Sequence, residues 1–270
     1  MDDFRVVKIK RAAAIELCKH HPHAPSMPNS AKIYFALYIN KQFRGLAAWG
    51  YGIMPKQLPV TLFGKKYSNN VGDYLELCRF FVDNDNVPRH SASKFLAITH
   101  RLLKKNTNVK WLFTYAAGFQ GLIGTIYKAS GYQHITPHET RLIYLPSQKS
   151  LVHPISFWHR YSLPVRAQTK QGIKLVKQIY PGAQIWCGHN YRYLYFLCSE
   201  AEKTSLLETA RFDFVPAPSK EDIKIWLEDE NGFVEWITDM ERAKHTPIIK
   251  LKTRRQPRKR NPATSRGQAV

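Results

Sequence analysis

The sequence has few cysteines, no long apolar run and few acidic residues over most of its length. The four cysteines, Cys18, Cys78, Cys187 and Cys198, form no Cys-x-x-Cys pair, which argues against a cysteine-based zinc site and favours buried, reduced thiols. No stretch approaches the roughly 18 apolar residues that a bilayer crossing requires. Charges occur every few positions near the N-terminus, so we expect no signal peptide and a cytoplasmic protein.

The charge that is present is strongly one-sided. Lys+Arg number 41 and Asp+Glu 20, a net charge of +21. Residues 17–199 carry 23 bases and five acids, residues 200–249 six bases and twelve acids, and residues 250–270 eight bases and no acid. Lysine and arginine gain affinity for phosphates by releasing condensed counterions, so nucleic acid is the expected partner. A basic protein without a specific ligand is the alternative.

Hydrophobic periodicity predicts an α+β fold. A hydrophobic fraction of 44% is sufficient for a folded core. Gly50 and Gly52 mark a bulge or a close backbone approach, and Gly131 ends a helix. We predict strands at 5–10, 32–39, 45–53, 73–82, 110–117, 132–135 and 141–145, the last two as a hairpin, and helices at 12–19, 93–105 and 120–130.

The C-terminal part differs in character. Residues 219–243 predict one or two short helices, interrupted at Asn231-Gly232, and 250–270 predict a disordered basic tail. We therefore divide the chain into a catalytic and DNA-binding domain (1–200), an acidic helical extension (201–249) and the tail (250–270). The extension docks on the basic domain or binds a protein partner, and the tail is a DNA arm or a solubilising terminus.

Several ordered motifs carry a family resemblance. They are YLELCR at 74–79, VPRHSASKFL at 87–96, TYAA at 114–117, GTIYKASG at 124–131 and GHNYRYLYFL at 188–197, together with the HHPH loop at 20–23. Over roughly residues 5–200 the chain resembles the bacteriophage Mom family of adenine-modifying proteins. The resemblance implies a GNAT-like mixed central sheet flanked by helices. It also implies an enzyme of the host cytoplasm that converts adenine in double-stranded phage DNA to its N6-carbamoylmethyl form, which protects the DNA from host restriction.

The chain departs from the family pattern at two positions. Ala117 and Leu122 stand where the resemblance leads us to expect Asp and His. Either a base or metal ligand has been lost, or its role has moved to another residue. A catalytically silent DNA-binding relative is therefore one alternative. A GNAT acetyltransferase acting on a peptide or small amine is another, although the glycine-rich pyrophosphate loop expected of it is missing.

Four residues are candidates for the chemistry. Glu76 lies in an otherwise apolar strand, where burial raises a carboxyl pKa toward the range of a general base. The alternative is a structural ion pair with Arg79, which requires a bulge because the two side chains otherwise point to opposite faces. Such a bulge is implied by the GNAT resemblance. Tyr127 corresponds to the tyrosine that protonates a leaving thiolate in GNAT enzymes, and Tyr115 is positioned to stack a flipped base; a core role is the alternative for both.

Cofactor and metal candidates come from two loops. Arg89, Ser91 and Ser93 precede or begin a predicted helix, where the resemblance implies the pyrophosphate of an acyl-CoA-type donor; helix capping by serine is the alternative. The histidines of the 20–23 loop, His20, His21 and His23, are close enough in sequence to share a ligand. The resemblance makes His21 or His23 a candidate contact for a metal such as iron or for the substrate, and solvated surface is the alternative. A carbamoylmethyl group is attached through an sp3 carbon, so the sequence leaves the donor undefined.

DNA contacts are predicted where bases alternate with aromatic residues and in the tail. Adenine N6 is buried in the duplex, so an enzyme acting on it must extrude the base, and backbone contacts must offset the energy that this costs. The predicted contacts are Tyr191, Arg192, Tyr193, Arg160, Lys252, Arg254, Arg255, Arg258, Lys259 and Arg260. Alternating aromatics at 191–197 are equally typical of a half-buried strand.

Overall fold

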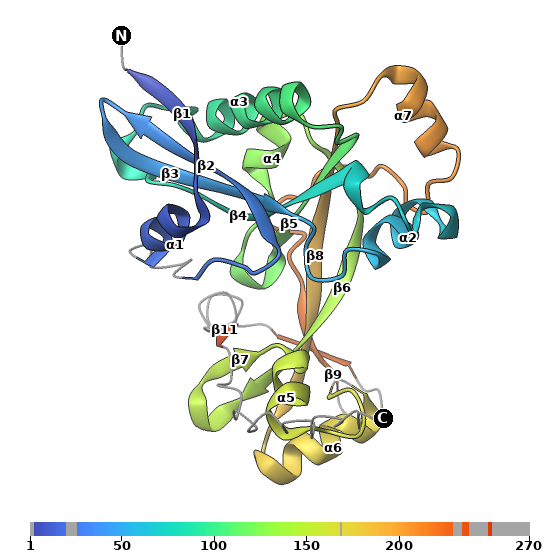
Figure 1. Ribbon diagram of the computed structural model, residues 1–270. Coiled ribbons are helices and arrows are strands. Elements are labelled where there is room, and N and C mark those ends of the chain that lie inside the picture. The colour runs from blue at the N-terminus through green and yellow to red at the C-terminus, as the bar shows by residue number, and fades with distance from the viewer. Residues whose placement is uncertain (1–2, 20–25, 168, 229–233, 238–247, 250–270) are drawn as a thin grey trace, which may run out of the picture. The chain divides into compact units, whose positions relative to one another are not determined.

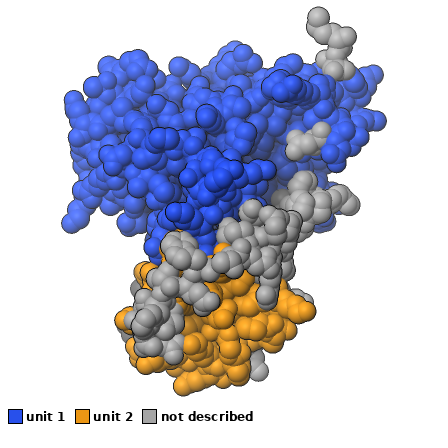
Figure 2. All heavy atoms as spheres, turned by 180° about the vertical axis from the view of Figure 1, so that it is seen from behind, with its two compact units in different colours: residues 1–140, 188–225 blue, residues 141–187, 226–270 orange. Residues whose placement is uncertain are grey.

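The computed structural model of the chain describes residues 3–19, 26–167, 169–228, 234–237 and 248–249. The chain forms two compact units, unit 1 (residues 1–140 and 188–225) and unit 2 (residues 141–187 and 226–270), shown in Figure 2. These units do not follow the predicted boundaries after residues 200 and 249, because the chain leaves unit 1 at residue 141 and returns to it at 188.

Unit 1 is built on a mixed sheet (Figure 1). Its strands and helices are β1 (Phe4–Ile9), α1 (Arg11–Lys19), β2 (Ala31–Ile39), β3 (Gln42–Gly50), α2 (Gln57–Phe63), β4 (Tyr74–Val82), α3 (Ser91–Asn106), β5 (Trp111–Ala117), α4 (Thr125–Ala129), part of β6 (Gln133–Leu145), most of β8 (Gln184–Phe196) and α7 (Glu200–Leu207). The strand order is β1-β2-β3-β4-β5-β8-β6. β4 and β5 are parallel, whereas β1–β2, β2–β3, β3–β4 and β5–β8 are antiparallel. The predicted α+β architecture with a mixed sheet is confirmed.

Helices cover both faces of this sheet. Phe63 of α2 packs edge-on against Trp111 of β5 with ring centroids 5.2 Å apart, and α1 packs over β2 and β3 on the same face. On the other face, His100 of α3 packs against Trp49 of β3 at 5.8 Å. Because side chains alternate along a strand, neighbouring residues of β4 and β5 point to different helical layers.

β4 contains the bulge that Glu76 and Arg79 need in order to share a face of the sheet. β4 also diverges from β5. Ala48 of β3 faces Arg79 while the next residue, Trp49, faces Leu77, so Cys78 is the extra residue. β4 pairs with β5 over Tyr74–Glu76, after which the described residues of the two strands form no further pairs. The bulge brings Glu76 and Arg79 to the same face of the sheet.

Two predicted elements are wrong in form. The predicted hairpin of 132–135 and 141–145 is one continuous strand, β6, because residues 213–215 supply hydrogen-bond partners for its polar middle: Thr136 N donates to Asp213 O and Val215 N to His134 O. The predicted helix at 120–130 begins only at Thr125, since Gly121 and Gly124 have positive φ angles of 72° and 75°.

The helix prediction for 219–243 is also wrong in the described residues. β9 (Ile225–Glu228) and β10 (Val234–Trp236) pair antiparallel, and β9 also pairs with β8. The edge of β8 accepts this segment as strands, which a local helical pattern does not reveal. In the described part of the extension, the helix is α7, which lies outside the predicted segment.

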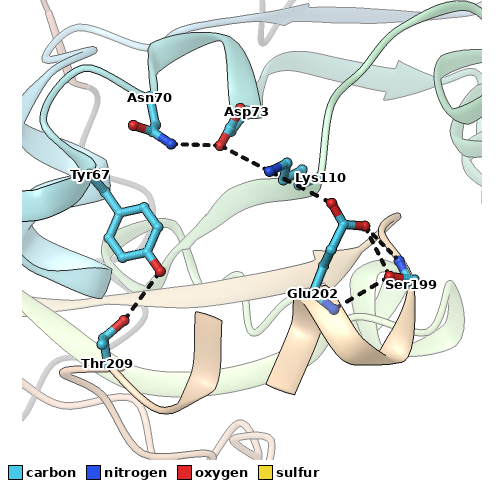
Figure 3. Close-up of polar contacts among 7 residues, drawn as sticks. All are labelled: Tyr67, Asn70, Asp73, Lys110, Ser199, Glu202 and Thr209. Atoms are coloured by element: carbon cyan, nitrogen blue, oxygen red, sulfur yellow. Dashed lines mark hydrogen bonds and ion pairs between the residues drawn. The ribbon is translucent and has the colours of Figure 1, made fainter. Parts of the chain in front are cut away.

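Polar contacts attach α7 to the start of β5 (Figure 3). Ser199 and Glu202 form a capping box at the N-terminus of α7. Lys110 lies 3.7 Å from the carboxylate of Asp73 and 3.6 Å from that of Glu202, so one ammonium group links the two segments. These contacts hold the N-terminus of α7 beside the starts of β4 and β5.

Unit 2 has its own apolar core. Its elements are the end of β6, β7 (Ser150–Val152), α5 (Pro154–Tyr161), α6 (Lys170–Ile179), the start of β8, β9 from Trp226 on, β10 and β11 (Ile248–Ile249). Phe157 and Val176 from the two helices are buried with Ile143 of β6. Among the described residues, no helix has both the length and the apolar composition needed to cross a membrane.

Candidate active site

Glu76 is the carboxylate around which the candidate site is built. It lies opposite Gly50 of β3 and is the last residue of β4 that pairs with β5. Its side chain packs directly on Gly52: a Cβ at that glycine would lie 2.2 Å from Glu76 Oε2, and Gly52 has a φ of 69°. Burial raises the pKa of the Glu76 carboxyl to about 7. Glu76 can therefore take up or release a proton near neutral pH.

Tyr115 and Arg192 face Glu76's side of the sheet. They are direct partners across β5 and β8. Burial, followed by the charge of Glu76, raises the pKa of Tyr115 to about 12, while Arg192 acts in the opposite direction. Arg192 is buried, with its Nε donating to the carbonyl of Thr136 at 2.5 Å. The group thus combines a titratable carboxylate, a neutral phenol that is 38% exposed, and a fixed cation.

Arg79 shares a face with Glu76 but points elsewhere. Its Nη2 donates to the carbonyl of Ser26 at 2.9 Å, and its Nε is buried with no hydrogen-bond partner in the described part of the chain. No ion pair joins Arg79 to Glu76 among the described residues, so the structural ion pair offered as an alternative is not formed there. Arg79 instead lies beside the segment that follows α1.

Tyr127 lies on the opposite face of the sheet. Its hydroxyl is hydrogen-bonded to the side chain of Thr114, while burial raises its pKa. Thr114 and Tyr115 are consecutive in β5 and therefore point to opposite faces. The structure brings Tyr115 to Glu76 but does not bring Tyr127 there.

The predicted donor-binding turn has an unusual backbone. His90 precedes α3 in a left-handed conformation with φ of 67°, where a glycine-rich turn would place glycine. The hydroxyls of Ser91 and Ser93 donate to the carbonyls of Pro88 and His90 at 2.7 and 3.0 Å. Neither serine is the N-cap, so the capping alternative is wrong. Arg89 is exposed, and it and the first backbone N–H groups of α3 are suited to an anionic group.

The predicted aromatic DNA contacts on β8 are buried. Tyr191 and Tyr193 are inaccessible, and their hydroxyls donate to the carbonyls of Asp222 and Ile123. Their rings therefore offer no stacking face to a base: Tyr193 packs against Tyr127 of α4, and Tyr191 packs against His134 of β6. Arg192 is likewise buried rather than presented to phosphates. Arg160 lies in α5 of unit 2, and the predicted tail contacts lie outside the described residues.

A polar cluster on β6 and β8 was not predicted from the sequence. His138 has its pKa lowered by burial and by Arg192, while Glu139 raises it and His189 lowers it further. Burial lowers the pKa of His189, Glu139 raises it and Lys224 lowers it further. Glu139 is one of five acids in the basic region 17–199, and that rarity was the available signal. The cluster supplies imidazoles and a carboxylate near Arg192.

The described residues do not form a metal site. No group of three or more His, Cys, Asp or Glu side chains among them is arranged to hold a metal ion. The loop histidines His20, His21 and His23 lie outside the described residues. The described residues thus do not fit an iron centre, and no chemical step is assigned to one.

Ala117 and Leu122 lie together at the end of β5. The Leu122 N–H donates to the Ala117 carbonyl at 3.2 Å, and the Leu122 side chain is exposed. Ala117 pairs with Asn190 of β8, next to His189 in the chain. The polar cluster therefore lies near the end of β5, where the chain has neither an acid at position 117 nor an imidazole at position 122.

Comparisons with known proteins agree with the motifs. Residues 3–213 match the Mom protein family. The chain is similar to "Methylcarbamoylase mom" of Escherichia phage Mu, with 24% identity over 195 residues, which cover 70% of this chain and 73% of the relative. Among solved structures, it aligns with a tandem GNAT protein from the clavulanic acid biosynthesis pathway, solved without AcCoA. That alignment has a TM-score of 0.36 and 10% identity, and covers 69% of this chain and 70% of the other.

Proposed function

Because the chain belongs to the Mom protein family, we propose that it is a transferase that places a carbamoylmethyl-type group on N6 of adenine in double-stranded DNA. The modification would protect phage DNA from restriction nucleases in the host cytoplasm. The observation that carries the proposal is Glu76: its carboxyl has a pKa of about 7, and it lies where β4 leaves β5, beside the exposed edge of Tyr115.

The chemistry explains why such a carboxylate is needed. The lone pair of adenine N6 is delocalised into the ring, so the amine is a poor nucleophile. It loses a proton as its new bond to carbon forms and the bond from that carbon to the rest of the donor breaks, the donor remnant leaving with the electron pair. Glu76 accepts that proton, and a pKa near the working pH suits a general base. Tyr115 orients the base through its partly exposed ring, and the buried Arg192 keeps positive charge near Tyr115.

The donor is constrained by the bond that it must form with adenine. The acceptor nitrogen bonds to an sp3 carbon, so simple acyl transfer from acetyl-CoA would give the wrong linkage. Arg89 and the first turn of α3 are the described groups that suit an anionic donor such as an acyl-CoA, and the residues of that turn bind rather than react.

Restriction of plasmid DNA tests the proposal. Plasmid recovered from cells that express the chain, and then stripped of protein, should resist nucleases whose recognition sites contain adenine. Plasmid from cells without the protein is the control. Full sensitivity of DNA from cells with abundant folded protein would contradict the proposal.

A second candidate function, DNA binding without catalysis, rests on Ala117 and Leu122. If the family's acid and imidazole at these positions are required, the wild-type chain leaves adenine unmodified, and Ala117→Asp with Leu122→His restores some modification. If Glu76 and nearby histidines have taken over, the double substitution is neutral or harmful, because a second carboxylate near Glu76 raises both pKa values.

A further inference from the structure

The loop between β3 and α2, residues 51–56, presents two large apolar side chains to solvent. Ile53 is 83% exposed and Met54 is 62% exposed. They are the most exposed of the large hydrophobic side chains in the described part of the chain. Single exposed apolar residues are ordinary, but two consecutive ones form an exposed apolar patch at the tip of the loop.

The backbone of this loop is held in place on both sides of the tip. The hydroxyl of Tyr74 donates to the carbonyls of Tyr51 at 2.7 Å and Pro55 at 3.1 Å. Tyr74 is itself fully buried and stacks on Trp111 with ring centroids 4.5 Å apart. The N–H groups of Gln57 and Leu58 donate to the Met54 carbonyl. The loop therefore keeps its apolar tip exposed on an anchored base.

The tip adjoins the candidate active site. Gly52, the residue immediately before Ile53, is in van der Waals contact with the Glu76 carboxylate. An object that contacts Ile53 and Met54 therefore lies next to the group proposed to accept the proton from adenine N6.

The charge around the loop favours a polyanion. Residues 17–72 include seven lysines and arginines and no acidic residue. Lys56 is the last residue of the loop, and Lys65 and Lys66 follow α2. All three are close to the tip in the sequence. An apolar tip followed along the chain by lysines is suited to DNA, where the cations meet phosphates and the tip meets the faces of stacked bases.

We infer that Ile53 and Met54 form a wedge that enters the base stack of duplex DNA beside the target adenine and holds that base out of the helix. The inference rests on the proposed function. Adenine N6 is inaccessible in the duplex, and extrusion costs free energy that inserted apolar side chains offset by replacing lost stacking. The wedge places the extruded base beside Glu76, because Gly52 connects the two.

The test uses DNA whose adenines are replaced by 2-aminopurine, which fluoresces when it leaves the stack. Wild-type protein should raise the fluorescence of a mixed-sequence duplex. The Ile53→Ser, Met54→Ser double variant should bind the duplex, as measured by anisotropy, with a fluorescence increase on the order of tenfold smaller. On the matching single strand, where no extrusion is needed, the two proteins should give equal signals. Val7→Ser, at an exposed apolar residue of β1, is the control.

The outcomes separate this inference from the proposed function. If cells expressing the wild type contain modified adenine but the double variant extrudes 2-aminopurine as well as the wild type, the wedge is overturned and the function stands. Absence of any fluorescence increase with bound wild type also overturns the wedge. If the double substitution changes only the oligomeric state measured by light scattering, the tip is a protein contact instead. Absence of modified adenine together with a lost fluorescence response in the double variant leaves the wedge supported and the transferase function contradicted.

Discussion

At the residue scale, Glu76 combines a buried position with a titration near neutrality. A carboxyl that is costly to charge in the folded state holds its proton more tightly there than in the unfolded chain. The same property that suits Glu76 to accept a proton therefore destabilises the fold when the group is ionised. Function and stability are opposed at this one side chain.

This opposition predicts how Glu76→Gln changes stability with pH. The pKa of about 7 in the folded state exceeds the ordinary value of 4.5. The contribution of Glu76 to the free energy of unfolding is therefore fully present below pH 4.5 and is lost as the pH rises through 7. At pH 8 the variant should be more stable than wild type by on the order of 2 kcal/mol, and the difference should vanish near pH 4. Urea unfolding at the two pH values measures this. A constant difference would mean that Glu76 titrates normally.

Gly52 provides a second prediction. A side chain at this position meets Glu76 Oε2 and must adopt a φ of 69°. Gly52→Ala should lower the free energy of unfolding by at least about 1–2 kcal/mol, from the backbone conformation alone. It should also displace the carboxylate and abolish modification. Gly72→Ala is the matched control, since a Cβ there has nothing within 4 Å. Equal effects of the two substitutions on stability and on modification would show that Gly52 is not part of the site.

Some of these residues were predictable from sequence and others were not. An acid inside an apolar strand stands out, and glycines at 50 and 52 signal a close approach, which the contact of Gly52 with Glu76 confirms. The burial of Arg192 and Tyr193 was not predictable, because alternating aromatic and basic residues form the same pattern whether other parts of the chain or solvent cover them. His138 and His189 come together only through the pairing of strands far apart in sequence.

At the element scale, the divergence of β4 from β5 sets the position of Glu76. Parallel pairing ends at Glu76, and the bulge at Cys78 turns the rest of β4 along β3. Periodicity located β4 correctly, because its run of apolar residues is local. It did not predict β9 and β10, whose strand form depends on the edge of β8.

The attachment of α7 gives a prediction for a single element (Figure 3). Ser199→Ala removes the capping box and should lower the free energy of unfolding by about 1 kcal/mol. Lys110→Met removes two ion pairs of partly exposed groups at 3.7 and 3.6 Å and should cost less, about 0–1 kcal/mol. Thermal or urea unfolding of both variants checks the order. A larger loss at Lys110 would show that the ion pairs, not the cap, hold α7.

At the scale of the whole molecule, charge is distributed in blocks. Residues 141–187 carry seven bases and no acid, as do residues 17–72, whereas residues 200–249 have a net charge of −6. Blocks of one sign give long-range attraction to DNA that depends on salt. The basic tail is the most concentrated of these blocks in sequence.

Deleting residues 250–270 should weaken DNA binding without changing the site. The deletion removes eight positive charges, so duplex affinity should fall and the slope of log K against log salt should become shallower. Anisotropy titrations at several salt concentrations measure the slope. An unchanged slope would exclude the tail from the interface.

The most direct test of the account is mass spectrometry of nucleosides from the DNA of cells expressing the wild type or Glu76→Gln. The amide is nearly isosteric with the carboxyl but cannot accept the proton, so the variant should fold, bind DNA and leave adenine unmodified. Wild-type DNA should contain a modified deoxyadenosine. Only unmodified adenine in the wild-type sample, from folded protein that binds DNA, or equal modification in both samples, would contradict the account.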